Sequence, residues 1–121
     1  MLSKPSSPNH ENTLLWLLKI ISGVLIIVIL GIHLVVNHLV APGGLLTYRD
    51  VVAYFQNPLV LVMEAVFLAC AVSHSLMGLR AILMDLNPPA RLVTLIDRLF
   101  LLLGVSAVFY GIWLLWAVSR G

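Results

Sequence analysis

Three long apolar stretches separated by short polar segments dominate the pattern of the chain. They run from about 14 to 41, 59 to 84 and 99 to 118. A helix needs about 20 mostly apolar residues to cross the hydrocarbon core of a bilayer, and each stretch is long enough. The pattern therefore predicts an all-α membrane protein, with one three-helix transmembrane domain over 14–121 after an exposed tail over 1–13.

Proline and glycine mark the two connections between these stretches. Residues 42–44, Pro-Gly-Gly, end the first stretch, and a polar connection that contains Arg49 and Asp50 leads to the second. Residues 87–89, Asn-Pro-Pro, stop the second stretch, because proline lacks an amide proton and clashes with the preceding turn. A short amphipathic segment around Asp97 then leads into the third stretch.

Composition excludes several classes of protein. Hydrophobic residues make up 61% of the 121 positions and charged residues 10%, against roughly 45–50% and about 25% in soluble domains. The one cysteine, Cys70, lies inside an apolar stretch and allows neither a disulfide framework nor a cysteine zinc site. The net charge of +2 comes from scattered basic residues, whereas nucleic-acid binding requires them on one face. We therefore expect a lipid bilayer, and no nucleic acid, as the chain's environment.

The basic residues also predict how the chain is oriented. Lysine and arginine near the ends of spans are retained on the cytoplasmic side. One side of the predicted layout holds Arg49 and Arg120, and the other holds the rest of the seven basic residues: Lys4, Lys19, Arg80, Arg91 and Arg98. The distribution places the N-terminus in the cytoplasm and the C-terminus outside.

Ionisable residues inside the apolar stretches carry the candidate chemistry. Each costs a few kcal/mol in lipid, and such residues usually face a bundle interior. They are His33, His38, Glu64, His74, Arg80 and Asp85. Neutral imidazole is a ligand for transition metals, and histidines from separate helices commonly hold a haem iron in a helical bundle. His33 and His74 are therefore the candidate haem ligands.

Depth separates the two candidate ligands. His33 lies about two thirds along an outward-going helix, whereas His74 lies past the middle of an inward-going one. At about 1.5 Å of rise per residue, their depths differ by on the order of 10 Å, which is too far for one iron. We expect two stacked haems, each with one axial histidine from this chain and one from a partner chain.

Small residues near His74 leave room for a flat cofactor. Cys70 and Gly78 lie one turn before and after it, and Asp85 returns to within about 20° of its face. In the third stretch, small side chains form a similar stripe that fits either a cofactor or simple helix packing: Gly104, Ala107 and Gly111.

Each candidate has a plainer interpretation. The two histidines could only hydrogen-bond across helices, and His38 fits an interfacial polar group. Glu64 could snorkel, pair with Arg49 or relay protons. Arg80 and Asp85 could form an interfacial charge pair.

The second stretch carries a motif that resembles a known family. His74 is followed by Gly78, Asp85 and Pro89, which is similar to the second helix of the hydrophobic membrane anchor of succinate dehydrogenase, respiratory complex II. The resemblance implies that His74 is an axial ligand of the haem b nearer the cytoplasm and that Asp85 lies by a quinone site. The family's quinone-bonding tyrosine is Leu86 here. Arg80 could replace it or bind a haem propionate.

The first stretch resembles the two-haem branch of these anchors. Ser22-Gly23, then His33 and Asn37, are similar to its first-helix haem-ligand pattern. The resemblance implies that His33 serves a second, outer haem and that the quinone is menaquinone. It further implies a prokaryotic inner membrane and three partners: a sibling membrane subunit that completes the anchor, an iron–sulfur subunit and a flavoprotein subunit. Two alternatives stay open, a haem-free structural or assembly subunit and the anchor of another quinone-linked cytochrome b complex.

Overall fold

The computed structural model describes residues 12–40, 43 and 47–121. Its elements are α1 (Thr13–Val35), the π-helical turn η1 (Val36–Val40), α2 (Tyr48–Phe55), α3 (Pro58–Asp85) and α4 (Ala90–Ser119). Three helices are long and apolar enough to cross a membrane: Thr13–Val40, Pro58–Asp85 and Ala90–Ser119. Within the described ranges the chain is helical and has no strand, so the predicted all-α fold with three long helices is confirmed. The expected tail lies almost wholly outside the described residues.

Side-chain caps and prolines set the helix bounds. Asn12 and Asn57 accept hydrogen bonds from the backbone N–H of Leu14 and Leu59, at 3.2 Å and 3.0 Å. After α3, Asn87 adopts a positive φ of 51° that turns the chain, and α4 begins directly after Pro89. The expected amphipathic segment before the third span is therefore the first part of α4 itself.

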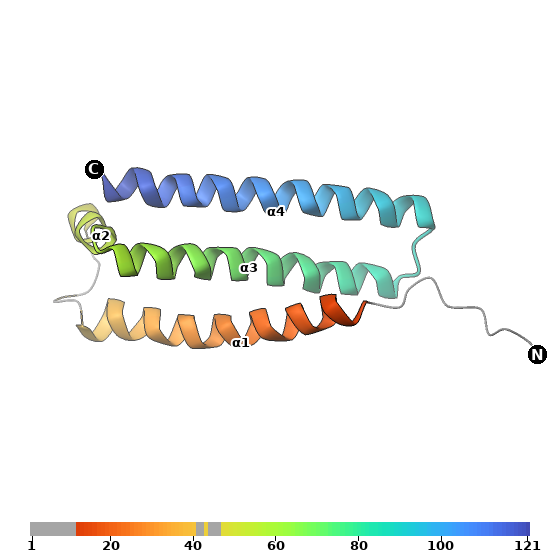
Figure 1. Ribbon diagram of the computed structural model, residues 1–121, viewed down its shortest axis with the longest axis horizontal. Helices are drawn as coiled ribbons and strands as arrows, with labels where there is room; N and C mark the ends of the chain where they lie inside the picture. Colours follow the sequence, from red (N-terminus) through yellow and green to blue (C-terminus); the bar gives the residue numbers. More distant parts are fainter. Residues whose placement is uncertain (1–11, 41–42, 44–46) are drawn as a thin grey trace, which may run out of the picture.

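The three long helices form a flat layer with α3 in the middle, between α1 and α4 (Figure 1). In the described part of the chain, α1 and α4 each pack on α3 but not on each other. A flat layer has no apolar interior, and three of its four most buried side chains are polar: Ser22, Asn37 and Glu64, with Val52. Polar contacts between helices are expected where lipid supplies no hydrophobic force for association.

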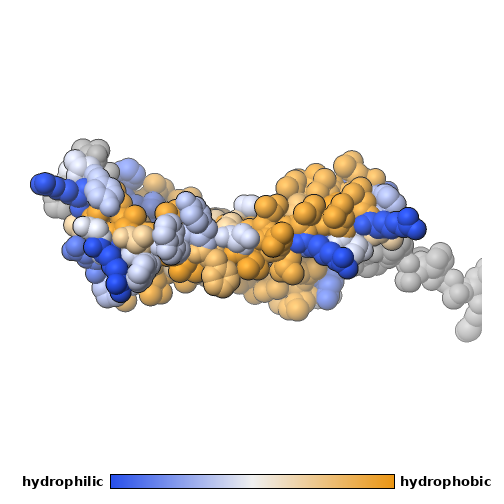
Figure 2. Space-filling model, turned by 90° about the horizontal axis from the view of Figure 1, so that it is seen from above, coloured by the Kyte–Doolittle hydropathy of each residue, from blue (hydrophilic) through white to orange (hydrophobic). Residues whose placement is uncertain are grey.

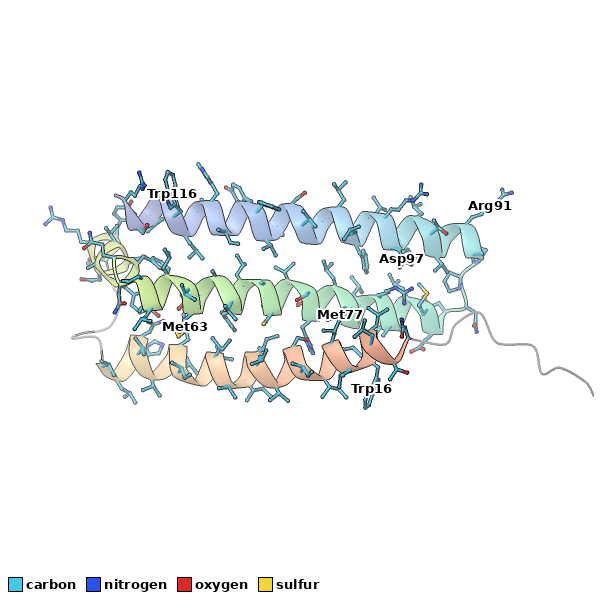
Figure 3. The ribbon with its side chains drawn as sticks, in the orientation of Figure 1. Trp16, Met63, Met77, Arg91, Asp97 and Trp116 are labelled. Carbon is cyan, nitrogen blue, oxygen red and sulfur yellow. The ribbon has the colours of Figure 1, made fainter. Side chains whose placement is uncertain are left out.

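The outer surface of the layer suits a bilayer. Hydrophobic residues cover its middle in the view of Figure 2, and hydrophilic residues gather toward its two ends. Trp16 on α1 and Trp116 on α4 lie near opposite ends (Figure 3), as expected for tryptophans at the two membrane interfaces. The Arg120 guanidinium lies over the Trp116 ring, 4.2 Å from its centroid.

The connection between the first two spans contains a helix, although its composition predicts only a polar segment. Thr47 and Asp50 form a capping box: the Thr47 N–H donates to Asp50 Oδ2 at 2.8 Å, and the Asp50 N–H donates to Thr47 Oγ1 at 3.2 Å. Helix α2 lies across one end of the layer, against α3 and α4 (Figure 1). We call this the α2 end and the opposite one the 86–89 end.

Candidate functional site

His74, on α3, contacts α1 through one ring nitrogen. Its Nδ1 lies 3.1 Å from the Lys19 carbonyl oxygen and 3.1 Å from Ser22 Oγ. A carbonyl oxygen only accepts hydrogen bonds, so Nδ1 carries the proton and Nε2 keeps a lone pair. In the described part of the chain, no protein atom is hydrogen-bonded to that Nε2.

A glycine lets the His74 ring approach α1. A Cβ added at Gly23 would lie 3.0 Å from His74 Cε1 and 3.5 Å from Nδ1, closer than side-chain carbons normally pack. Beside it, the Ser22 hydroxyl donates to the Lys19 carbonyl at 3.0 Å. The sequence pattern groups Ser22 and Gly23 with His33, whereas the structure shows that both contact the histidine of the neighbouring helix.

His33 lies toward the α2 end, with both ring nitrogens engaged. Its Nδ1 lies 2.6 Å from Glu64 Oε1, across the α1–α3 interface. Its Nε2 lies 2.8 Å from the Asn37 amide nitrogen and accepts a hydrogen bond from it. The ring also stacks on Phe67, with centroids 5.9 Å apart.

Tyr54 of α2 completes this group. Its hydroxyl donates to Glu64 Oε1 at 2.8 Å, the same oxygen that contacts His33. Burial raises the pKa of the Tyr54 phenol, and the hydrogen bond and negative charge of Glu64 raise it further, so Tyr54 stays a donor. We call His33, Asn37, Tyr54 and Glu64 the His33 cluster. Glu64 is 8% exposed and bonded within this cluster, in place of snorkelling or pairing with Arg49.

The helix register separates the two histidines along the membrane normal. His33 is level with Glu64, and His74 follows Glu64 by ten positions in α3. Ten residues of α-helix span about 15 Å, more than the difference of about 10 Å inferred from the sequence. The two imidazoles therefore lie at different levels and cannot bind one iron.

Arg80 pairs with a residue to which the sequence pattern does not connect it. Its Nε and Nη2 donate to the two carboxylate oxygens of Asp97 on α4, at 2.6 Å and 3.2 Å. The pair borders a groove of about 360 Å³ along α3 and α4, which Ser73 and apolar residues also line. Asp85 is exposed at the last residue of α3, near the 86–89 end.

The small residues of α3 and α4 differ in their surroundings. Cβ atoms added at Gly104 and Gly111 would collide with Leu76 and Leu68 of α3, so these glycines serve simple helix packing. A Cβ at Gly78 would meet nothing within 4 Å. The open space expected one turn from His74 is therefore present in this chain.

The two imidazoles fit a haem iron to different degrees. The described residues contain no group of three or more metal-ligating side chains, but a haem needs one axial ligand from each of two helices. His74 fits, because Nδ1 is anchored and Nε2 carries a lone pair without a protein partner in the described residues. His33 has the same proton arrangement, and iron would have to replace the hydrogen bond from Asn37.

Comparisons with known proteins agree on a single family. A family model described as succinate dehydrogenase/fumarate reductase transmembrane subunit matches residues 5–113. A protein of Archaeoglobus fulgidus named succinate dehydrogenase hydrophobic membrane anchor subunit is 31% identical over 118 residues, which cover 98% of this chain and 100% of that relative.

Proposed function

The chain belongs to the family of succinate dehydrogenase/fumarate reductase transmembrane subunits, and from this premise we propose that it holds haem b together with a sibling subunit. It is a multi-pass membrane anchor subunit. In the proposed function, electrons pass from an iron–sulfur subunit through this bundle to a membrane quinone. Succinate itself does not contact this chain.

The observation that carries the proposal is the state of the His74 ring. Haem, when bound, supplies one-electron chemistry. The Lys19 carbonyl and the Ser22 hydroxyl hold Nδ1, which fixes the tautomer and directs Nε2 away from its anchor. Metal-binding histidines characteristically donate their other N–H to such an acceptor. Gly23 allows this arrangement because it leaves space for the ring.

A sibling subunit is needed to complete the site. The three long helices form a layer rather than a closed bundle, and many large apolar side chains on them are exposed. Haem sites in bundles use ligands from facing helices, so the sibling subunit would supply the second axial histidine. The flavoprotein and iron–sulfur subunits would dock at the 86–89 end, on the cytoplasmic side of a prokaryotic inner membrane, where most basic residues gather.

The proposal extends to a second haem and a quinone. His33 would be the axial ligand of the outer haem, at the α2 end. The quinone, menaquinone in our proposal, would bind near Asp85 at the 86–89 end, because Arg80 and Asp97 place polar groups beside an apolar groove there. In this arrangement Arg80 contacts the quinone or a haem propionate.

Haem content of the purified complex tests this function. We expect two haems b per complex, the loss of one in His74→Ala and the loss of the other in His33→Ala. The matched control is His38→Ala, because His38 is exposed on η1 and its removal should leave both haems. Full haem content in His74→Ala would refute the proposal.

A haem-free structural role is the second candidate, and the His33 cluster favours it. Its hydrogen bonds join α1, α2 and α3 without any cofactor. A wild-type complex that shows no b-type absorbance after reduction would establish this role in place of haem binding.

A further inference from the structure

We propose that Glu64 is a positioning residue that lowers the reduction potential of the haem at His33, and that Tyr54 moderates this effect. The inference rests on the proposed second haem and adds an assignment of residues that do not touch it. It makes the two haem sites of this chain electronically unequal.

The first step is the nature of the acceptor at each Nδ1. At His74 the acceptors are a neutral carbonyl and a hydroxyl, both at 3.1 Å. At His33 the acceptor is the Glu64 carboxyl group, at 2.6 Å. Glu64 Oε1 contacts two donors, His33 and Tyr54, as an ionised carboxylate does because it only accepts.

The second step is the effect of this charge on the ring. A carboxylate that accepts the Nδ1 proton makes the imidazole a more basic ligand. A more basic ligand favours the oxidised iron, and hydrogen bonding around the ligand is one of the means by which proteins set a haem potential. Glu64 is 8% exposed, so water screens its charge only weakly.

The third step concerns Tyr54, which shares the acceptor oxygen. The phenol donates to Glu64 Oε1 at 2.8 Å and draws electron density away from the bond to His33. Removal of the phenol should therefore strengthen the effect of Glu64 on the ring. Changes at Glu64 and at Tyr54 should move the potential in opposite directions.

Redox titration of the purified complex, followed by haem absorbance and by the low-spin electron paramagnetic resonance signal, tests the inference. In Glu64→Gln the amide oxygen can still accept the Nδ1 proton but carries no charge. We expect the His33 haem to show an about tenfold higher reduced-to-oxidised ratio at a given potential, which is about 59 mV for one electron. In Tyr54→Phe we expect the ratio to fall.

Asp50→Asn is the matched control. Asp50 lies at the same end of the layer and caps α2, and asparagine keeps a cap acceptor while removing a carboxylate that does not contact His33. We expect no shift in this variant, and no shift of the His74 haem in any of the three variants.

The outcomes separate this inference from the proposed function. Two haems with unchanged potentials in Glu64→Gln, or an equal shift of both, would overturn the inference and leave the two-haem function standing. A single haem in the wild type would overturn both. If Glu64→Gln fails to assemble, Tyr54→Phe decides by its sign, and an unchanged or raised potential would overturn the inference.

Discussion

The His74 site and the His33 cluster fix an imidazole between the same two helices by different means. His74 is held by neutral groups of α1 and keeps one ring nitrogen without a protein partner in the described residues. His33 is held by a buried carboxylate and an amide, which engage both nitrogens. A neutral anchor adds no further charge to the membrane interior, whereas a carboxylate there needs supporting donors. Here Tyr54, from a helix outside the spans, is one of them.

The largest effect should come from filling the space at Gly23. In Gly23→Val the new side chain would meet the His74 ring, since even a Cβ would lie 3.0 Å from it. We expect loss of the His74 haem to the extent seen in His74→Ala, with the His33 haem retained. Haem quantification checks this. Gly31→Val is the control, because a Cβ at Gly31 meets nothing within 4 Å, and equal losses in both variants would contradict the prediction.

Glu64→Leu should break the other site. It would leave the His33 Nδ1 proton and the Tyr54 hydroxyl without their acceptor, and each buried donor left without a partner costs about 1–3 kcal/mol. We expect loss of the His33 haem and a lower Tm of the complex, while the His74 haem stays. A variant that retains both haems and an unchanged Tm would show that the cluster has no structural role.

Asn37→Ala should sharpen the comparison by making the two sites more alike. It removes the donor from His33 Nε2 and also removes Asn37 Oδ1, which is buried and has no hydrogen-bond partner in the described residues. A hydrogen bond contributes about 1 kcal/mol net, so we expect an about fivefold higher haem affinity at His33. Haem titration of the apo complex measures it. Weaker binding would indicate that Asn37 supports the ligand rather than competing with the iron.

The smallest effect should follow Ser22→Ala. His74 keeps the Lys19 carbonyl as acceptor, and hydrogen bonds between membrane helices average about 0.6 kcal/mol. We expect unchanged haem content and a slightly lower Tm of the complex. Loss of the His74 haem in this variant would mean that the hydroxyl, and not the carbonyl, fixes the tautomer.

The sequence is sufficient to predict the spans but not their contacts. Apolar length alone predicts three long helices, since bilayer thickness sets that length. It also separates His33 and His74 in depth, because rise per residue is constant. Helix α2 has a sequence signal of its own, the Thr47 and Asp50 capping box, but the helix is short and its polar composition is equally typical of a loop.

Contacts between helices depend on register and rotation, which one sequence does not display. The pairing of Glu64 with His33 has a partial signal, because both count to a similar depth from the same membrane face. The placement of Gly23 against His74 has none. Arg80 and Asp85 are five positions apart, which puts them about 140° apart on a helix, whereas Asp97 reaches Arg80 from α4.

The flat layer makes the energetics of this chain one-dimensional. Since α1 and α4 pack on α3 and not on each other in the described residues, a disturbance in one can reach the other only through α3. Free-energy changes of substitutions at distant sites without shared partners usually add. Paired substitutions in α1 and α4 should therefore be additive, whereas either paired with α3 should show coupling, so α3 is the helix in which sequence change is most constrained.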